Sequence, residues 1–421
     1  MSAPAGASGG PDGPRPELVW RTARIDHDVD LLAVAGGDGF LFAREGDGRA
    51  GHGVAARVPR ATVAAALASS RPVADAAHAG PTRGPIAFGA LPFLPDAPAD
   101  LVVPALVVGR STDGARWATT VAVDEAPADP LAAVEEVLAA APARPDPGPG
   151  GFEVRSSRPP ADWVAAVAAA TERIRAGALD KVVLAREVVV TADGPIPIAT
   201  VLLRLAQAHP SCFLYLVDGF CGASPELLVS RTGDVVRAQP MAGTAPRRGD
   251  PVADARLAAN LLASPTYRHE HQVTIDAVHD GLLPFCSYVD FEPEPSVVAL
   301  ANVQHLASHV EGRLSHPPAT VLDLVAALHP TPAVCGRPRA AALALIDELE
   351  GLDRRRYAGA VGWVDGAGDG RWAVAIRGAS IDGATARVVA GNGIVGDSDP
   401  PTELIETRAK LQAVLPAIVR P

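Results

Sequence analysis

The sequence predicts a mixed α and β fold with a large core, and two observations carry that prediction. Short β-type runs, for example residues 40–43 and 117–123, alternate with Ala-rich helical patterns such as residues 60–69. With 421 residues, of which 48% are hydrophobic, the chain is long enough to bury a sizeable core in one large domain or two. This pattern is compatible with an α+β architecture but does not select it unaided.

Charge and cysteine usage argue against several classes of function. The formal net charge is -11 and no basic run stands out, which argues against nucleic acid and anionic membranes as partners. The four cysteines are scattered without a Cys-x-x-Cys pair, so neither a zinc site nor a disulfide framework is indicated. Residues 1–15 are rich in Gly, Pro and Ser, which predicts a disordered tail rather than a signal peptide. Because no apolar run is long enough to span a bilayer, we expect a soluble, cytoplasmic protein.

The first third of the chain has the character of a scaffold. Residues 30–35, 40–43, 101–108 and 117–123 are predicted strands, and residues 142–151, which end in RPDPGPGG, indicate a linker or a long surface turn. A helix is predicted next, at residues 162–176. We therefore distinguish the tail at 1–15, a first part at 16–150 and a second part at 151–421.

Two charged residues of the second part stand in apolar surroundings. Lys181 opens the β-type run KVVLAREVVV, so it is either an exposed strand end or a buried amine, and a buried amine can act as a base near neutral pH. Glu226 lies between a proline and a run of aliphatic residues, where an unpaired carboxylate has a raised pKa, as a general acid requires. The alternative is a glutamate paired with a nearby arginine. Residues 239–244 add backbone N–H groups and a hydroxyl that suit a carboxylate.

Two helices carry acidic residues that suit a metal ion. One is predicted to begin at Ser264 and carries Glu270 on an apolar face, while its histidines lack the spacing of a zinc motif. The other follows a Gly-rich loop at residues 391–396, and on it Glu403, Glu406 and Lys410 share one face. Oxygen ligands on two helices suit Mg²⁺ if the helices meet, and the alternative is a solvated surface.

Three further stretches are each more typical of structure than of function. His305 lies in a β-type run that begins at residue 302, and residues 329–336 form a proline-fixed loop that contains Ala333. Residues 357–363 and 371–381 predict a β-hairpin, in which Arg377 interrupts an apolar strand. An arginine there is either an edge residue or a bidentate clamp for a carboxylate.

Together these segments resemble the chorismate-utilising enzymes, and most closely the isochorismate synthases of siderophore and menaquinone pathways. Residues 16–178 fit only in general character, as the variable first part of the same fold. The resemblance rests on eight motifs in the family's order: LDKVVLAR (179–186), GASPELLV (222–229), PMAGT (240–244), RHEH (268–271), VQHL (303–306), HPTPAVCG (329–336), the strand with Arg377, and GIV followed by E-x-x-E-T-x-x-K (393–410).

The resemblance implies an α+β fold of one large domain, with a large antiparallel β-sheet core surrounded by helices and a chorismate-binding catalytic core at 151–421. Lys181 would be the general base that activates water for attack at C2 of the chorismate ring. Glu226 would be the general acid that protonates the departing C4 hydroxyl. Glu270 and Glu406 would hold Mg²⁺, with support from Glu403.

The resemblance also implies a set of substrate contacts. One group would bind the enolpyruvyl carboxylate, a second would frame the ring, and Ala333 would lie beside them in its loop. The first group comprises Tyr357, Arg377, Lys410 and the backbone at Gly393, and the second comprises Gly243, Thr244 and His305.

Three positions separate the sister activities of the family. Relatives that use ammonia typically have Gln where this chain has Lys181, and aminodeoxychorismate synthases tend to carry Lys where it has Ala242. Water is therefore the expected nucleophile. Salicylate synthases share Lys181 but often have Thr at the position of Ala333, so isochorismate is the expected product.

The resemblance thus implies an isomerase, a Mg²⁺-dependent isochorismate synthase that acts as a monomer without a glutaminase subunit. Its product would feed siderophore synthesis, through 2,3-dihydroxybenzoate or salicylate, or menaquinone synthesis. Two alternatives stay open. One is a salicylate synthase, which goes on to eliminate pyruvate, and the other is a non-catalytic chorismate-binding regulator.

Overall fold

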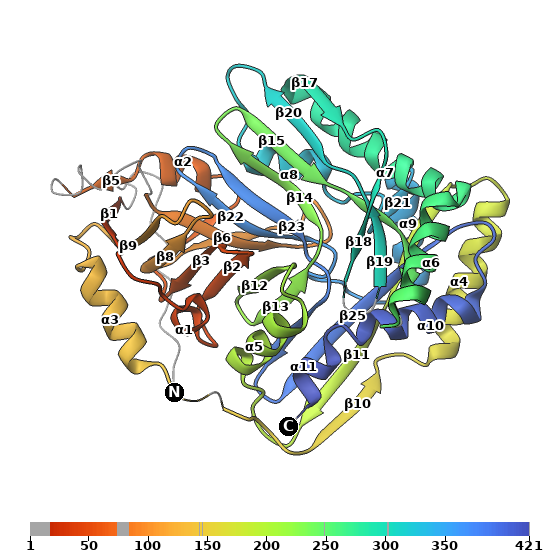
Figure 1. The fold of residues 1–421 in the computed structure, drawn as a ribbon, viewed down its shortest axis with the longest axis horizontal. Helices are drawn as coiled ribbons and strands as arrows, with labels where there is room; N and C mark the ends of the chain where they lie inside the picture. Colours follow the sequence, from red (N-terminus) through yellow and green to blue (C-terminus); the bar gives the residue numbers. More distant parts are fainter. Residues whose placement is uncertain are drawn as a thin grey trace.

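The core consists of two large β-sheets with helices on their outer faces (Figure 1). The structure is a computed structural model that describes residues 17–73, 84–142, 144, 146–247, 249–300 and 303–420. The tail predicted at 1–15, and residue 302 at the start of the run with His305, lie outside the described residues. Strand pairs are antiparallel apart from β1 with β5, and the predicted α+β fold is confirmed.

Among the described residues, the first sheet has thirteen strands and contains the run that begins with Lys181. In order across the sheet these are β10 (Phe152–Ser156), β11 (Lys181–Ala192), β25 (Thr385–Ile394), β24 (Gly378–Asp382), β13 (Phe220–Ser224), β12 (Phe213–Val217), β2 (Phe40–Arg44), β3 (Asp47–His52), β8 (Leu106–Arg110), β9 (Arg116–Val123), β1 (Leu18–Arg24) and β5 (Arg71–Pro72), and β21 (Gly336–Arg337) pairs with β11.

In the part of the chain that the structure describes, the second large sheet has nine strands and a third sheet has three. Strands from before and after residue 150 share both large sheets. The nine are β17 (Cys286–Phe291), β20 (Val310–Leu314), β15 (Val235–Gln239), β14 (Leu227–Thr232), β23 (Gly370–Val374), β22 (Ala360–Asp365), β6 (Ile86–Leu91), β7 (Asp100–Val103) and β4 (Ala56–Pro59), and the three are β16 (Met241–Pro246), β19 (Val303–Ala307) and β18 (Ser296–Ala299).

Aromatic side chains from both large sheets meet in the core. Phe40 of β2 stacks on Phe88 of β6, with ring centroids 5.9 Å apart, and Phe42 lies 5.3 Å from Phe213 of β12. Such rings bury a large apolar area each and hold the two layers together. The helices are α1 (Leu31–Ala35), α2 (Val63–Ala68), α3 (Pro130–Ala140), α4 (Pro160–Arg175), α5 (Ile198–Ala208), α6 (Pro251–Ala263), α7 (Pro265–Leu282), α8 (Val321–Leu328), α9 (Arg339–Leu349), α10 (Pro400–Leu411) and α11 (Leu415–Val419), with a 3₁₀ turn at η2 (Leu283–Phe285).

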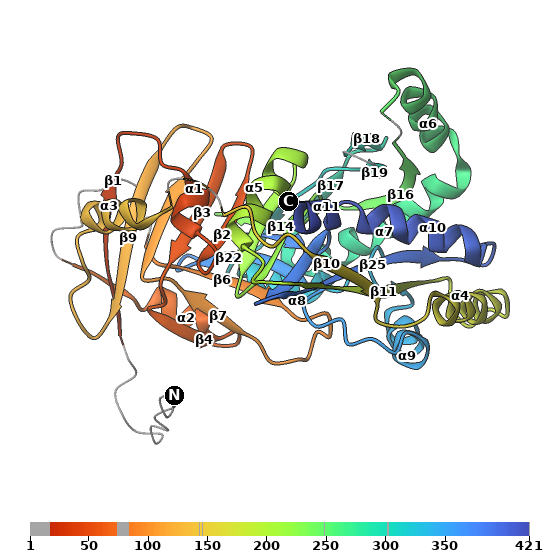
Figure 2. The same cartoon turned by 90° about the horizontal axis from the view of Figure 1, so that it is seen from below.

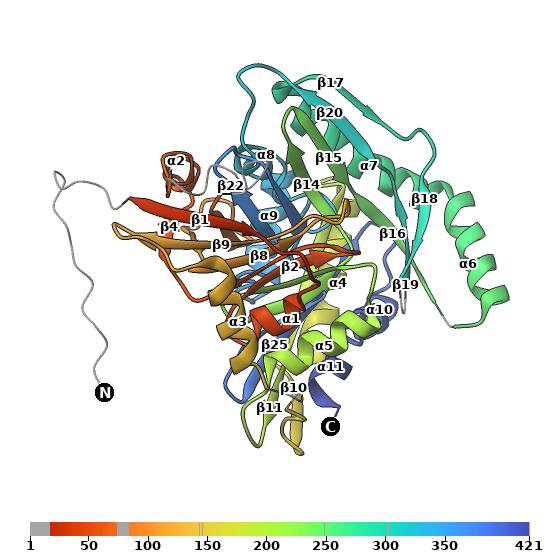
Figure 3. The ribbon, with the colours of Figure 1, turned by 60° about the vertical axis from the view of Figure 1, so that its left-hand side comes forward.

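Helix α7, helix α10 and the three-stranded sheet gather at one end of the molecule, away from β1 and β9 (Figures 2 and 3). The caps of both helices are those that the sequence predicts: the Ser264 hydroxyl accepts the Tyr267 N–H at 3.4 Å, and the Asp399 carboxylate accepts the Thr402 N–H at 3.1 Å. In the part of the chain that the structure describes, no helix has the length and apolar character to cross a bilayer.

Two strand predictions in the first part were wrong. Residues 30–35 contain helix α1, because the Asp30 carboxylate caps it by accepting the Leu32 N–H at 2.9 Å. Residues 101–108 form two strands, β7 and β8, and Pro104 lies between them. A proline has no N–H to donate to the strand ladder, so the pairing stops there.

Two predictions near the site were also wrong. Gly391 and Gly393 belong to strand β25 rather than to a loop, because they pair with Ala185 and Val183 of β11. Residues 371–381 are not one strand: β23 ends at Val374 in the nine-stranded sheet, and β24 begins at Gly378 in the thirteen-stranded one. Arg377 lies at this crossing with φ 55, a left-handed conformation that interrupts any strand.

Candidate active site

A single cavity of about 740 Å³ is lined by every residue to which the sequence assigns a site role. These residues come from strands of the thirteen-stranded and three-stranded sheets, from segments between strands, and from helices α7 and α10. They are Lys181, Glu226, Gly243, Thr244, Glu270, His305, Ala333, Tyr357, Arg377, Gly393, Glu403, Glu406 and Lys410.

Lys181 is a buried amine, with only 6% of its surface exposed. Its stem crosses Gly393 of the neighbouring strand: a Cβ at Gly393 would lie 2.5 Å from Lys181 Cε. The glycine therefore leaves the room that the lysine stem occupies. The ammonium group reaches helix α7, where Nζ lies 2.6 Å from Glu270 Oε1. Of the two alternatives, exposed strand end or buried amine, the structure shows the second.

Glu270 is the ionised partner in this pair. Burial opposes its ionisation, but the charge and the hydrogen bond of Lys181 outweigh burial and lower the pKa of Glu270. A carboxylate that faces an ammonium group at 2.6 Å makes a charge-assisted hydrogen bond.

Glu226 has the opposite character and lies between β13 and β14, with 4% of its surface exposed. Burial raises its pKa to about 8, against the backbone hydrogen bond from Met241 and the charges of Arg377 and Lys181. Among the described residues no arginine forms an ion pair with it. Glu226 therefore holds a proton at neutral pH, as a general acid must.

His305 and the β16 turn form one wall of the cavity. Gly243 has φ +74 at a register shift between β16 and β19. The Nδ1 atom of His305 lies 3.2 Å from the Gly243 carbonyl oxygen and 3.1 Å from Thr244 Oγ1. Because a carbonyl oxygen only accepts, we assign the hydrogen to Nδ1, which makes Nε2 an acceptor. Burial lowers the pKa of His305 to about 3, so the ring is neutral.

Arg377 supplies a positive charge between the two large sheets. Its charge acts on Tyr357, which is 8% exposed, and on Glu226. The strand crossing at Arg377 thus places a guanidinium beside the buried acid and a phenol, instead of at a sheet edge.

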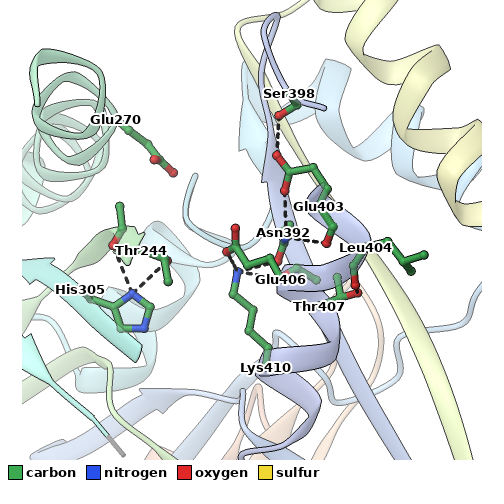
Figure 4. Close-up of polar contacts among 12 residues, drawn as sticks. Thr244, Glu270, His305, Asn392, Ser398, Glu403, Leu404, Glu406, Thr407 and Lys410 are labelled. Carbon is green, nitrogen blue, oxygen red and sulfur yellow. Dashed lines mark hydrogen bonds and ion pairs between the residues drawn. The ribbon is translucent and has the colours of Figure 1, made fainter. Parts of the chain in front are cut away.

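Lys410 on α10 is held by three protein acceptors (Figure 4). Its Nζ lies 2.6 Å from Asn392 Oδ1, 3.2 Å from the Gly391 carbonyl oxygen and 2.8 Å from Glu406 Oε1. An ammonium group has three hydrogens, so each of them has a partner here. Burial lowers the pKa of Lys410, and the charge of Glu406 works against that shift.

Asn392 and Ser398 are site residues that the sequence reasoning missed. The Asn392 side-chain amide donates to Glu403 Oε2 at 2.8 Å and to the Glu403 carbonyl oxygen at 3.0 Å. Ser398 Oγ donates to Glu403 Oε1 at 2.8 Å (Figure 4). Asn392 is 1% exposed. A polar residue inside an apolar strand was the available signal, and interpreting residues 391–396 as a loop concealed it.

A second missed signal is the distribution of lysine. The sequence has 37 Lys and Arg residues, of which 35 are arginines, so Lys181 and Lys410 are its only lysines. Both line the same cavity and both are buried. An amine can lose its proton and a guanidinium cannot, so a chain that otherwise uses arginine has a reason to keep lysine here.

The carboxylates fit the donor chemistry of Mg²⁺. The pKa of the Tyr267 phenol is raised by burial and then by the charges of Glu406, Glu270 and Glu403, so these three face one part of the cavity. In the described ranges no three His, Cys, Asp or Glu side chains group closely enough to hold a metal by themselves. Lysines engage one oxygen of Glu270 and one of Glu406, so a cation would compete with two ion pairs.

Acidic groups outnumber basic ones along the cavity wall. An anion that enters this cavity therefore needs additional positive charge. Among the described lining residues, the acids other than the protonated Glu226 are Asp180, Glu270, Asp397, Asp399, Glu403 and Glu406, and the lysines and arginines are Lys181, Arg337, Arg377 and Lys410.

Residues 57–419 match the family model described as chorismate binding enzyme. The chain is 31% identical over 407 residues to the vibriobactin-specific isochorismate synthase of Vibrio cholerae, which covers 95% of this chain and 96% of that protein. It is 41% identical over 278 residues to isochorismate synthase DhbC of Bacillus subtilis, covering 63% of this chain and 70% of that protein. The structure of MenF, the menaquinone-specific isochorismate synthase of Escherichia coli, has the same fold, with a TM-score of 0.82 and 24% identity over 96% of this chain and 95% of that one.

Proposed function

Because the chain belongs to the family of chorismate-binding enzymes, we propose that it is an isochorismate synthase, which converts chorismate to isochorismate. One observation carries the proposal beyond the family: a buried amine, Lys181, and a buried carboxyl group that holds its proton, Glu226, line the same cavity. A base and an acid with separate environments are what a displacement of hydroxyl by water requires. The names of the relatives support the same activity.

In the proposed step, the Lys181 ammonium group has first released a proton, and the neutral amine takes a proton from water as the water oxygen bonds to C2 of the ring. The ring double bonds shift and the C4–O bond breaks. Glu226 donates its proton to the departing hydroxyl, which leaves as water. One water enters and one leaves, so the reaction is an isomerisation, and proton return to Glu226 from Lys181 resets both groups.

We further propose that Glu270, Glu406 and Glu403 hold Mg²⁺, with support from their oxygen chemistry and the acidic cavity wall. When bound, the ion supplies positive charge for a carboxylate of the substrate. The second carboxylate would bind Arg377 and Tyr357, and the support is that both line the cavity together with the protonated Glu226. His305 offers Nε2 as a neutral acceptor for a ring hydroxyl.

Product identification tests the proposal. Purified protein is incubated with chorismate and Mg²⁺, and the products are separated by chromatography, with EDTA and ammonium salts as parallel conditions. We expect isochorismate, no product with EDTA, and no amination with ammonium. Salicylate and pyruvate as main products would instead identify a salicylate synthase. Chorismate binding without turnover under Mg²⁺ or Mn²⁺ would identify a binding protein.

A further inference from the structure

The strand that begins with Lys181 lacks a partner strand along part of one edge. On its other edge, β11 pairs with β25 from Val182 to Thr191. On this edge, β21 pairs with Lys181 and Val182, and β10 pairs with residues 188–192. Within the described residues no strand faces residues 183–187, so their backbone groups need other partners.

A buried ion pair fills this gap. The Glu350 carboxylate accepts the Ala185 N–H at 2.7 Å, and Arg354 Nη2 donates to the Val183 carbonyl oxygen at 2.6 Å. Glu350 and Arg354 also bind each other twice, Nε to Oε1 and Nη2 to Oε2, at 2.6 Å each. Side chains thus replace the missing strand, beginning at Val183, two residues after Lys181.

The pair is enclosed and fully engaged. The side chains of Arg354 and Glu350 are 2% and 1% exposed, and the guanidinium carbon lies 4.2 Å from the centre of the Phe93 ring. A buried ion pair adds little net stability compared with apolar residues of the same volume. Its presence here therefore points to a need for fixed geometry, which the forked guanidinium meets through directional bonds.

Arg354 binds three segments that carry predicted site residues. The strand residue that it binds, Val183, lies two positions after Lys181 and opposite Gly393. Its Nη1 atom donates to the Val334 carbonyl oxygen at 2.9 Å, next to Ala333 in the loop 329–336. Its own carbonyl oxygen accepts the Tyr357 N–H at 2.8 Å. One side chain and its peptide group therefore tie a strand, a loop and a turn that all reach the cavity.

We propose that the Glu350–Arg354 pair positions the active site by holding Lys181, Ala333 and Tyr357 in one fixed arrangement. The catalytic part of this inference rests on the proposed isochorismate synthase function. Arg354 serves three different acceptors from three nitrogen atoms. A lysine in its place keeps the charge but offers one compact ammonium group, which cannot span these acceptors.

The test compares three variants by kcat, KM and thermal unfolding. We expect Arg354→Lys and Glu350→Gln to lower kcat by about 30-fold or more, with KM within about threefold of wild type, because a displacement of about 1 Å misaligns the reacting groups. Arg173→Lys is the matched control, since Arg173 forms a 2.8 Å pair with Glu348 that is half exposed, and neither residue lines the cavity. Its kcat should stay within about twofold of wild type.

A second readout separates positioning from a purely structural role. The sequence has two lysines, so a limiting amine-directed reagent followed by mass spectrometry reports the labelling ratio of Lys181 to Lys410. We expect this ratio to change in Arg354→Lys and to stay constant in Arg173→Lys. The ratio needs no turnover, so it still tests positioning if wild-type protein makes no isochorismate, a result that would contradict the proposed function instead.

Folded variants with wild-type kcat and an unchanged labelling ratio would overturn the proposal. If Arg354→Lys fails to fold, Glu350→Gln carries the test, because it keeps the side-chain shape. Failure of both variants to fold would show that the pair serves folding rather than positioning, and would also overturn it.

Discussion

The two lysine–glutamate pairs of the cavity have similar lengths but different surroundings. Lys181 and Glu270 are 89 residues apart in the chain and meet at 2.6 Å, whereas Lys410 and Glu406 are one helical turn apart on α10 and meet at 2.8 Å. Within the described residues the Lys181 ammonium has one hydrogen-bond acceptor, Glu270. The Lys410 ammonium has three.

The number of acceptors suits the two lysines to different roles: Lys181 can transfer a proton, whereas Lys410 holds a fixed positive charge. Moving or deprotonating Lys410 breaks bonds to Asn392, Gly391 and Glu406 together, so it is suited to hold Glu406 and the end of β25 in place. Lys181 has a single partner to lose, and that partner, Glu270, is one of the proposed Mg²⁺ ligands. This difference favours the proposal that Lys181 is the base, and we propose that Lys410 has a supporting role in addition to the substrate contact that the family resemblance implies.

Removing the amine of Lys181 should have the largest effect. Lys181→Ala should lower kcat by about 10³-fold or more, because no base remains, while chorismate still binds in the intact cavity. Lys181→Arg keeps the charge opposite Glu270 but cannot give up its proton, so it should be equally inactive. Steady-state kinetics and calorimetric titration with chorismate measure the two quantities.

The matched variant is Lys410→Arg. It also keeps a positive charge, but three acceptors must accommodate a larger group, so we expect a lower melting temperature with turnover still measurable. If Lys181→Arg retained turnover while Lys410→Arg lost it, the roles assigned to the two lysines would be reversed.

Gly393→Ala tests the Lys181 pair alone and should have the second largest effect. The added Cβ would lie 2.5 Å from Lys181 Cε and 3.0 Å from Nζ, so the lysine stem must move. We expect kcat to fall by about 10²-fold, as for a displacement of about 1 Å. The melting temperature of the protein should stay unchanged, because the contacts of Lys410 are not altered. A crystal structure of the variant with Lys181 in its original position, together with wild-type kcat, would contradict this explanation of the glycine.

The sequence identified single residues better than their pairings. Helix caps at Ser264 and Asp399 are local signals, so both helices were predicted from the sequence. The resemblance to the family identified the candidate residues, and all of them line one cavity. The Lys181–Glu270 contact joins a strand to a helix that is distant in the sequence, and the Glu350–Arg354 pair, although local in sequence, binds the distant strand β11. Arg377 was placed in a strand because its change of sheet leaves no local trace except an interrupted apolar pattern.

The pH dependence of kcat/KM tests a third group, the carboxyl group of Glu226, independently of the two lysines. Glu226 must be protonated to donate, and burial raises its pKa to about 8. The protonated fraction falls as pH rises above that value, so kcat/KM should fall by about tenfold per pH unit there. The same alkaline limb should remain in Lys410→Arg at a lower rate, because Lys410 is not the acid. A profile that stays flat to pH 10 would exclude Glu226 from this role.

Ser398→Ala should have the smallest effect. Ser398 contacts Glu403 on α10, the helix that carries Lys410, so the substitution leaves the Lys181–Glu270 pair unchanged. It removes the 2.8 Å hydrogen bond from Ser398 Oγ to Glu403 Oε1 and the 3.2 Å hydrogen bond that Oγ accepts from the Val395 N–H, while Asn392 still holds Glu403 Oε2. The loss of one such hydrogen bond is worth about 1 kcal/mol, or about fivefold in an equilibrium or rate. If Glu403 supports a metal ion, the loss should appear as a higher Mg²⁺ concentration for half-maximal activity, with kcat at saturating Mg²⁺ nearly unchanged. A fall in kcat at saturating Mg²⁺ would instead show that Glu403 acts on the substrate through Asn392 and Lys410. The Lys410–Glu406 pair would then take part in turnover as the Lys181–Glu270 pair does.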